Sequence, residues 1–347
     1  MEPDDGRTAV LSTIGSASRS IDLTIYELND TEIVEALIAA EGRSATVRVL
    51  YNWYSFSSEE QERFVSPTIQ QMIRAGIACR PAPRAFEVTH AKAFTVDGSV
   101  AIVQSFNLTP EYFGSTRDFG VISSVPAEVT EVAEVFESDW SGATATSAAP
   151  TLVWSPINAR EKLTQLIANA QHTLEVYFEE IGDPGTLGTL VAAARRGVRV
   201  RLIAAVLASE GSPNGNAPGI GFLTAGGVDA VCKSIPFPTP SGSAPLYVHA
   251  KAIVADFGTS AAHAFVGSEN LSCVSLDDNR ECGILVSEPA LLARLESVFA
   301  SDWGQPSVPT TITSAPLTPC PANASVRARE RILGRSGSRT GLREGSP

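Results

Sequence analysis

The feature of this sequence that most constrains its fold is a long internal repeat, in which one unit of strands and helices occurs twice. The segment "SIDLTIYELND" at 20–30 resembles "TLEVYFEEIGD" at 173–183, and each is an apolar run that ends in carboxylates, as expected of a buried strand. Residues 33–52 and 187–206 then share helical apolar spacing, a glycine stop and a Val-rich strand. A chain built in this way is expected to fold as two similar halves.

The repeat continues beyond these first elements. Residues 69–83 and 219–236 each predict a short helix, a glycine C-cap and a further strand. Near the end of each unit a helix closes with almost the same letters, "VFESDW" at 135–140 and "VFASDW" at 298–303. Strands and helices that alternate in this way predict an α/β fold in which helices cover the sheet.

The repeat also predicts the domain boundaries. The two units are joined by "SGATATSAAPT" at 141–151, which has the composition of a linker. We therefore expect an N-terminal half at 1–144 and a C-terminal half at 150–306. Residues 307–347 are rich in Pro, Ser and Thr and then in Arg, and we expect a tail that is at least partly disordered.

Composition limits the class of protein. Hydrophobic residues make up 44% of the 347 residues, which indicates a globular chain, and no apolar run approaches the ~18 residues of a membrane span. The net charge is −12, but the last 24 residues carry +4, so the rest of the chain carries −16. A body this acidic is a poor match for nucleic acid, whose binding is mainly electrostatic. The charge of the tail comes from six arginines, Arg327, Arg329, Arg331, Arg335, Arg339 and Arg343, against Glu330 and Glu344.

The cysteines do not indicate a metal site. The five residues Cys79, Cys232, Cys273, Cys282 and Cys320 show neither a CxxC pair nor another metal-ligand spacing. Because their number is odd, at least one thiol stays unpaired within the chain. One disulfide or none is expected, the pairing of Cys273 with Cys282 is left open, and the redox compartment is not fixed.

Within each unit a set of polar residues follows a histidine at fixed spacing. From His90, a lysine lies at +2, an aspartate at +7, a serine at +15, an asparagine at +17 and an arginine–aspartate pair at +27 and +28. These residues are Lys92, Asp97, Ser105, Asn107, Arg117 and Asp118.

The second histidine, His249, begins the same series. The matching residues are Lys251 at +2, Asp256 at +7, Ser268 at +19, Asn270 at +21, Arg280 at +31 and Glu281 at +32. Every position after the aspartate is displaced by four, so one four-residue insertion within "FGTSAAHAF" explains all the differences. The Gly, Ser and Ala in that stretch predict a lengthened hairpin turn.

This set of residues suits phosphate chemistry. A histidine and a lysine two apart in a strand share one face, as do a serine and an asparagine two apart in a neighbouring strand. Together they bring a positive charge, hydroxyl and amide donors and a nucleophile or acid to one place, where several donors can converge on the spread charge of a phosphate. The carboxylate 28 or 32 residues after each histidine is placed to accept the other ring N–H of that histidine.

The two segments resemble the paired HxKxxxxD and GSxN motifs of the phospholipase D superfamily. The resemblance covers roughly residues 8–305, with both F-x-S-D-W helices, and is nearest to secreted bacterial phospholipase D-like proteins that carry both motifs in one chain. It implies two α-β-α sandwich halves, with mixed sheets covered by helices, that are related by a pseudo-twofold axis.

The resemblance also implies a mechanism in which both histidines meet in one site. His90 attacks the phosphodiester phosphorus and forms a phosphohistidine, while His249 protonates the leaving alcohol and then acts as base. Metal and cofactor are not required, since the lysines supply the charge that a metal would bring. The phosphoryl oxygens are held by Lys92, Lys251, Asn107 and Asn270, with Ser105 and Ser268 assisting. The histidines are oriented by Asp118 and Glu281, and Asp97 and Asp256 are structural.

Some residues depart from this pattern or lie beside it. The first motif has Gln104 where the family usually has glycine, which the second keeps at Gly267. We expect the glutamine side chain either to narrow the pocket or to alter access for phosphate. His172 and His263 have no partners in register and are expected at the surface. The carboxylates Glu27, Glu179 and Glu180 end strands that can face the site, and solvated or capping roles are expected for them.

The sequence and the resemblance together predict a phospholipase D-type phosphodiesterase that hydrolyses glycerophospholipids and transfers the phosphatidyl group to alcohols. Apolar loops at 50–58 and 234–247 favour a lipid substrate on a membrane or micelle surface. The alternatives are a metal-independent nuclease of the same superfamily and a phosphate-binding module with weak catalysis. We expect a monomer with no obligate protein partner and no nucleic acid.

The resemblance implies secretion, with a cytoplasmic location as the alternative. The chain begins "MEPDDGRTAV", which is neither a signal peptide nor an anchor, so secretion requires that a signal has been trimmed.

Overall fold

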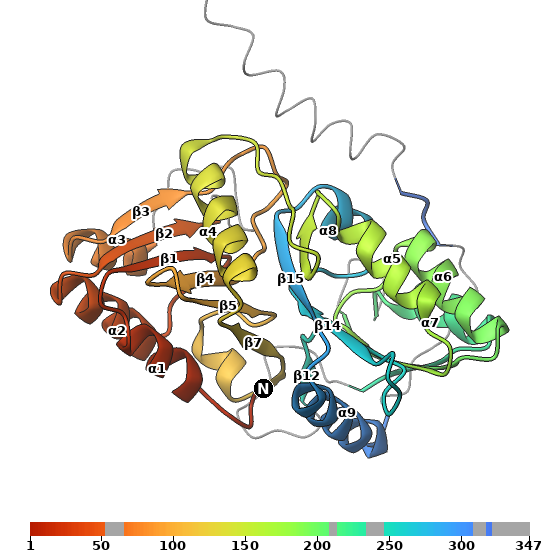
Figure 1. Ribbon diagram of the computed structural model, residues 1–347. Coiled ribbons are helices and arrows are strands. Elements are labelled where there is room, and N and C mark those ends of the chain that lie inside the picture. The colour runs from red at the N-terminus through yellow and green to blue at the C-terminus, as the bar shows by residue number, and fades with distance from the viewer. Residues whose placement is uncertain (53–65, 208–213, 234–245, 308–316, 321–347) are drawn as a thin grey trace, which may run out of the picture.

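The computed structural model describes residues 1–52, 66–207, 214–233, 246–307 and 317–320. These residues form two α/β halves that lie side by side, each around one central sheet (Figure 1). The predicted architecture of two similar halves of mixed sheet and helix is therefore confirmed. The expected tail falls mostly on residues 308–316 and 321–347, which lie outside the described residues.

The first half contains a six-stranded sheet in the order β3-β2-β1-β4-β5-β7. The strands of this sheet are β1 (Ser20–Ile25), β2 (Thr46–Tyr51), β3 (Ala78–Pro81), β4 (Ala93–Val96), β5 (Val100–Gln104) and β7 (Gly120–Ser123). The short β6 (Thr116–Arg117) lies outside it. The helices of this half are α1 (Thr8–Gly15), α2 (Thr31–Gly42), α3 (Pro67–Arg74), the 3₁₀ helix η2 (Pro110–Phe113) and α4 (Pro126–Ser141).

The second half repeats this order with one more strand, β11-β10-β9-β13-β14-β15-β8. The strands of this sheet are β8 (Leu152–Ser155), β9 (Thr173–Phe178), β10 (Arg199–Ala204), β11 (Asp229–Cys232), β13 (Ala252–Ala255), β14 (His263–Gly267) and β15 (Glu281–Val286). The short β12 (Tyr247–Val248) lies outside it and pairs with β6. The helices of the second half follow the same pattern. They are α5 (Ala159–Asn169), α6 (Pro184–Arg195), α7 (Ala217–Ala225), α8 (Cys273–Asp277) and α9 (Pro289–Gly304).

Each sheet joins a parallel part to an antiparallel hairpin. In the first half β1 is parallel to β2 and antiparallel to β4, and in the second half β9 is parallel to β10 and antiparallel to β13. The β4–β5 turn spans 97–99, whereas the β13–β14 turn spans 256–262, so the predicted insertion does lengthen this hairpin.

The hairpin aspartates hold the turns against the sheet. Asp97 and Asp256 follow β4 and β13 with left-handed backbones, at φ 54° and 53°. The Asp97 carboxylate accepts backbone N–H bonds from residues 18–20, and the Asp256 carboxylate accepts them from residues 171–173. Burial opposes ionisation, but these donors lower the pKa of both carboxyls below the usual value. Their contacts are those of structural residues.

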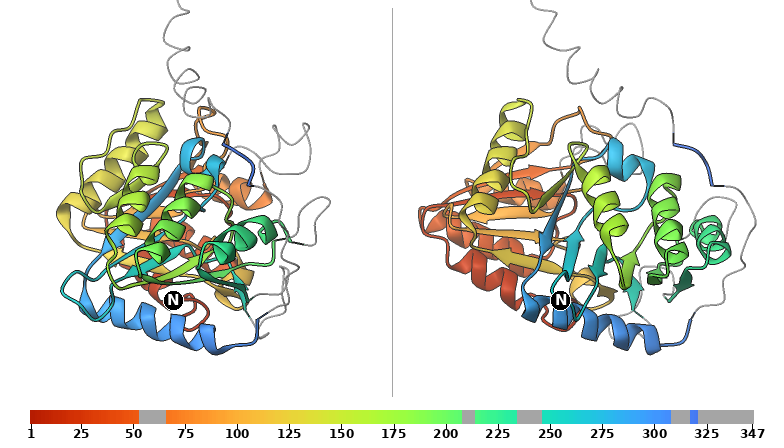
Figure 2. Two further views of the ribbon diagram at one scale, coloured as in Figure 1. Left: turned by 90° about the vertical axis from the view of Figure 1, so that its right-hand side faces the viewer. Right: turned by 45° about the vertical axis from the view of Figure 1, so that its right-hand side comes forward.

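The two halves share a core. One buried cluster joins Val103 and Val132 of the first half to Trp154, Val266 and Phe299 of the second. Figure 2 shows α5, α6 and α7 together on one face of the second sheet, with α9 apart from them and beside the N-terminus. The ion pair of Arg294 with Asp5, 2.6 Å, joins α9 to that end. No helix among the described residues is long and apolar enough to cross a membrane.

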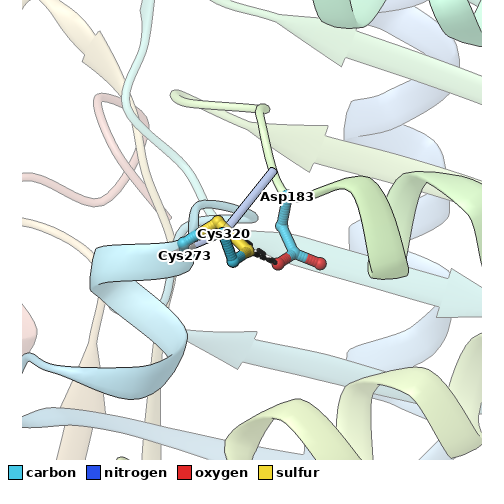
Figure 3. A group of neighbouring side chains, drawn as sticks. All are labelled: Asp183, Cys273 and Cys320. Carbon is cyan, nitrogen blue, oxygen red and sulfur yellow. Dashed lines mark hydrogen bonds between the residues drawn. A yellow bond between two sulfur atoms is a disulfide. The ribbon is translucent and has the colours of Figure 1, made fainter. Parts of the chain in front are cut away.

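One disulfide ties residue 320 back to the body of the protein. Cys273, at the start of α8, is bonded to Cys320, and their Cα atoms are 5.5 Å apart (Figure 3). The adjacent Asp183 carboxylate caps α6 through the N–H of Thr186 and pairs with Arg160 at 2.8 Å. Because the sulfurs are bonded to each other and an arginine holds the carboxylate, this group is not arranged to bind a metal. Cys282 is a buried free thiol and is not the partner of Cys273.

Candidate active site

The backbone of each histidine is held by the opposite half. Residues just before His90 run beside Arg280, and the N–H groups of His90 and Ala91 both donate to the Arg280 carbonyl at 2.8 Å. In the same way β12 pairs in parallel with β6, and the N–H groups of His249 and Ala250 donate to the Arg117 carbonyl at 3.2 and 2.8 Å. Each histidine therefore lies at the boundary between the halves.

The guanidinium groups of these arginines form a second crossed contact. Arg117 binds Asp302 of α9 at 2.7 Å, and Arg280 binds Asp139 of α4 at 2.8 Å. Both aspartates belong to the repeated "SDW" ends of the helices. This repeat is thus explained, since each "SDW" aspartate fixes the arginine whose carbonyl holds a histidine.

The carboxylates next to the arginines are exchanged between the halves as well. Asp118 of the first half lies 2.8 Å from Nδ1 of His249, and Glu281 of the second half lies 2.8 Å from Nδ1 of His90. The expectation that each carboxylate binds the histidine preceding it in its own half is wrong. Spacing along the chain places the carboxylates correctly in each repeat but does not say which histidine they face.

The two serines contact carboxylates. Ser105 donates to Asp118 at 2.6 Å and Ser268 donates to Glu281 at 2.7 Å, and both serines are fully buried. The expected assistance in phosphate binding is therefore replaced by another arrangement, in which each hydroxyl holds the carboxylate that orients a histidine. Thr116 adds a further donor to Asp118 at 2.6 Å.

The motif lysines are fully buried beneath the histidines. Nζ of Lys92 donates to the His90 carbonyl, and Nζ of Lys251 donates to the His249 carbonyl, both at 2.6 Å. These contacts fix two cations next to the imidazoles. Each lysine directly precedes a strand, β4 or β13. Its carbonyl accepts the backbone N–H of Gln104 or Gly267 at 3.1 Å, which extends the hydrogen bonding of the hairpin by one residue.

The motif asparagines face the ends of β1 and β9. Nδ2 of Asn107 donates to Glu27 at 3.3 Å, while Oδ1 of Asn270 accepts the N–H of Glu180 at 3.1 Å. The second contact leaves the amide nitrogen of Asn270 for a substrate oxygen.

One cavity brings part of the predicted site together, while the fully buried Lys92, Lys251, Asp118, Ser105 and Ser268 are not part of its wall. His90, His249, Asn107 and Asn270 all line a single cavity of about 1630 Å³. Its wall also includes residues 83–88 and 139–145, together with Ile157 and Val274. Because both imidazoles reach the same space, one substrate atom can be approached from both halves.

The two imidazoles have different surroundings. Burial lowers the pKa of His90 to about 4, against the opposing charge of Glu281. His90 is therefore neutral near pH 7, with Nδ1–H donated to Glu281 and a free electron pair on Nε2. His249 has a carboxylate at each ring nitrogen, because Oε2 of Glu179 lies 3.5 Å from its Nε2.

Two buried groups beside His90, namely Lys92 and Glu281, have pKa values below their usual values. Burial, together with the nearby charge of Lys251, lowers the pKa of Lys92 to about 7, against the opposing charge of Glu281. Burial opposes ionisation of Glu281, but its contact with His90 and the charge of Lys92 lower its pKa below the usual value. Glu281 is therefore ionised and fits its place as the acceptor of the His90 N–H.

A family model described as "Cardiolipin synthase, PLD-like domain" matches residues 10–140 and 163–303, which is most of the chain. The chain belongs to the phospholipase D superfamily. Both halves of this superfamily member are matched, so the repeat in the sequence is a repeat of the family domain. This membership supports a phosphodiesterase-type function, and it leaves the reaction and the substrate to be proposed.

Two of the proteins similar to this chain share little sequence with it. The mitochondrial cardiolipin hydrolase of Chlamydomonas reinhardtii is 23% identical over 130 residues, which is 38% of this chain and 55% of that protein. The structure of polyphosphate kinase from Porphyromonas gingivalis has a TM-score of 0.63 at 15% identity, over 95% of this chain and 53% of that one. This chain thus spans about half the length of these two relatives.

A third comparison covers both chains. Phosphatidylserine synthase from Haemophilus influenzae has a TM-score of 0.65 at 13% identity, over 95% of this chain and 91% of that one. At these identities the solved structures show the phospholipase D fold alone.

The departure from the family motif does not reach the cavity. Gln104 is buried, donates to the Phe106 carbonyl at 2.9 Å and is absent from the cavity wall, so the expected narrowing is wrong. In the second half the buried Glu269 occupies this region, and a Cβ on Gly267 would lie 2.4 Å from its Oε2. The same Cβ would lie 2.6 Å from the Cα of Gly283, a backbone atom that cannot move aside as the end of the Glu269 side chain can. Gly267 is therefore needed for the close approach of β14 to β15.

Other expectations have mixed outcomes. His172 and His263 are exposed, as expected. The strand-end carboxylates Glu27, Glu179 and Glu180 line the cavity, so the strands they end do face the site. Glu27 is exposed to solvent, as expected, whereas Glu179 is paired with Lys251. The predicted apolar loops at 50–58 and 234–247 lie mostly outside the described residues, which omit 53–65 and 234–245.

Sequence reasoning also passed over two aromatic residues that contact the histidines. Tyr26 lies edge-on to His90 with ring centroids 4.8 Å apart, and Tyr112 lies edge-on to His249 at 4.7 Å. Aligning the two repeats pairs Tyr26 with Glu179 and Glu27 with Glu180, directly after β1 and β9. That alignment is the signal that could have identified these wall residues.

Proposed function

We propose that this protein is a phospholipase D-type phosphodiesterase that hydrolyses glycerophospholipids to phosphatidic acid and the free head-group alcohol. With a competing alcohol it transfers the phosphatidyl group to that alcohol. The observation that carries this proposal is the single cavity in which two imidazoles each hold an Nδ1–carboxylate contact with the opposite half. Such a pair provides a nucleophile and an acid on opposite sides of one phosphorus atom.

In the first step Nε2 of His90 attacks the phosphorus. The P–O bond to the head group breaks, and His249 gives its proton to the departing oxygen. In the second step His249 removes a proton from water or an alcohol, whose oxygen attacks the phosphorus, and the P–N bond to His90 breaks. Lys92 and Lys251 hold the phosphoryl oxygens in both steps, so the added negative charge is balanced within the protein.

The lining of the cavity favours a lipid over a nucleic acid. Six carboxylates contribute to its wall, against the two cations Arg84 and Arg280, and a polyanion would be repelled there. The six belong to Glu27, Glu87, Asp139, Glu179, Glu180 and Glu281. Apolar side chains are exposed on the same wall, with Ile157 at 39% and Val274 at 45%. These features support a single phosphodiester attached to acyl chains.

The test is an assay of phosphatidylcholine micelles with ethanol and EDTA. Phosphatidic acid and phosphatidylethanol should both form, and both should disappear in His90→Ala. If plasmid DNA is nicked while no lipid product forms, the protein is a nuclease of the same superfamily. If both substrates stay intact, the protein is a phosphate-binding module and the proposed activity is wrong.

We also propose that the protein is secreted and acts as a monomer. The Cys273–Cys320 disulfide supports an oxidising compartment, since such bonds are rare in the cytoplasm. Non-reducing mass analysis of protein from the source cells tests this, because free thiols at both positions would favour the cytoplasmic alternative.

A further inference from the structure

The two half-sites differ at one matched position beside each buried lysine. Tyr26 follows β1 in the first half and Glu179 follows β9 in the second. Nζ of Lys92 lies 5.1 Å from the centre of the Tyr26 ring, whereas Nζ of Lys251 lies 2.8 Å from Oε2 of Glu179. One motif lysine thus faces an aromatic ring and the other is already paired with an anion.

Glu179 is held at this place by three side chains. Its Oε2 contacts Lys251 and lies 3.5 Å from Nε2 of His249, and its Oε1 accepts the hydroxyl of Tyr247 at 2.7 Å. Burial opposes ionisation, but the charges of Lys251 and His249 lower the pKa of the Glu179 carboxyl below its usual value. The carboxylate is therefore ionised on the wall of the cavity.

This anion competes with the phosphate for Lys251. A phosphoryl oxygen that approaches Lys251 comes close to Oε2 of Glu179, and two negative charges at such a distance repel each other. A positive charge supplied by the substrate removes the conflict, because it can pair with Glu179 while Lys251 turns to the phosphate.

The position of Glu179 indicates which part of the substrate carries that charge, and this step rests on the proposed function. In-line attack by His90 places the departing oxygen on the opposite side of the phosphorus, at His249. The group attached to that oxygen is the head group, and Glu179 is the carboxylate beside Nε2 of His249.

We infer that Glu179 is a specificity-determining residue that selects an alcohol with an ammonium group close to its hydroxyl, as in ethanolamine and choline head groups. The ammonium replaces Lys251 as the partner of Glu179, and Lys251 then binds a phosphoryl oxygen. Because His249 activates the acceptor alcohol at the same place, the preference applies to acceptors too.

The test is competition between phosphatidylethanolamine and phosphatidylglycerol with identical acyl chains, mixed equally in one detergent micelle. A shared micelle removes differences in surface binding. The wild type should release ethanolamine about tenfold faster than glycerol. In Glu179→Gln, which keeps the shape but loses the charge, the ratio should fall close to one. Glu180→Gln is the matched control, since it removes a neighbouring wall carboxylate that has no contact of this kind with His249, and it should keep the ratio.

The other results overturn the inference. A wild-type ratio near or below one shows that no ammonium is selected, and an equal loss in Glu180→Gln shows a general effect of negative charge. If Glu179→Gln is inactive on both lipids, the test becomes the choice of acceptor alcohol in transfer by the wild type. Ethanolamine should then outcompete glycerol as acceptor, and equal use of the two alcohols would contradict the inference. If the wild type forms phosphatidic acid from neither lipid, the proposed function itself is wrong, and the inference fails with it.

Discussion

His90 and His249 occupy matched places in the two halves, yet their rings have different neighbours. His90 has one carboxylate, Glu281, and the edge of Tyr26, while His249 lies between Asp118 and Glu179. An imidazole that is neutral near pH 7 suits a nucleophile, and one with a carboxylate at each nitrogen suits a group that holds and delivers a proton. This difference supports the assignment of attack to His90.

Trapping of the covalent intermediate tests these two roles. After an alkaline denaturing quench, mass spectrometry should find a phosphatidyl group on His90 in the His249→Ala variant, because breakdown of the intermediate needs the missing base. His90→Ala should show no adduct. An adduct on His249 in His90→Ala would exchange the two roles.

The pKa of Lys92 predicts the alkaline limb of the pH profile. Lys92 acts in its charged form, and burial lowers its pKa to about 7, so kcat/KM should fall about tenfold per pH unit above that value. His90 acts in its neutral form, and its pKa of about 4 should set the acid limb. In Lys92→Arg the guanidinium stays charged, so the normalised profile should lose its alkaline limb. A limb that stays near pH 7 in this variant would show that another group sets it.

At the scale of elements, the ends of α4 and α9 act as clamps on the opposite half. Asp139 holds Arg280, whose carbonyl binds the backbone of His90, and Asp302 holds Arg117, whose carbonyl binds the backbone of His249. The helices thus influence the histidine positions indirectly, through the backbone carbonyls of Arg280 and Arg117.

Truncation of Asp139 and of Asp302 should lower stability by different amounts, and each should slow a different chemical step. Asp139→Ala leaves the guanidinium of Arg280 buried, and urea unfolding should show a loss of roughly 3–5 kcal/mol. Asp302→Ala should lose less, because Arg117 keeps Asp4 at 3.1 Å. In burst kinetics, Asp139→Ala should slow formation of the phosphohistidine and Asp302→Ala should slow its breakdown. The reverse assignment of these steps would contradict the crossed arrangement.

The elements could be predicted largely from the sequence, because apolar periodicity and the repeat both report on local structure. The lengthened β13–β14 hairpin followed from a spacing difference of four residues. The contacts between the halves could not be predicted in this way. The spacing of Asp118 from His90 is the same whether the carboxylate faces that histidine or the other one. The same limit applies to Ser105 and to the Cys273–Cys320 bond, whose partners are decided by packing.

At the scale of the whole molecule, both halves contribute to each histidine, and a single chain supplies both. Shared burial of Val132 with Val266 and Phe299 joins the halves through one core. The site is therefore complete within one polypeptide, which is consistent with the proposed monomer.

Mixing of two inactive variants tests this completeness. His90→Ala and His249→Ala, purified separately and combined, should stay inactive, because every site in the mixture lacks one imidazole. Activity that appears on mixing, up to about a quarter of the wild-type rate if halves exchange freely between two chains, would show that the protein pairs its halves across chains. Size-exclusion chromatography of each variant is the accompanying control.

The exchange of Asp118 and Glu281 between the halves also constrains how such a gene can diverge. Once the two copies of a duplicated ancestor depend on each other for the orientation of their imidazoles, neither copy can decay or be lost without disabling both chemical steps. Divergence at the exchanged positions is then confined to the choice of carboxylate, aspartate at 118 and glutamate at 281. The tyrosine in one copy opposite the glutamate in the other marks a position outside the exchange, where the side chain can change in kind. The duplicated copies are thus free to specialise for the two ends of a phosphodiester only while each keeps a carboxylate at its exchanged position.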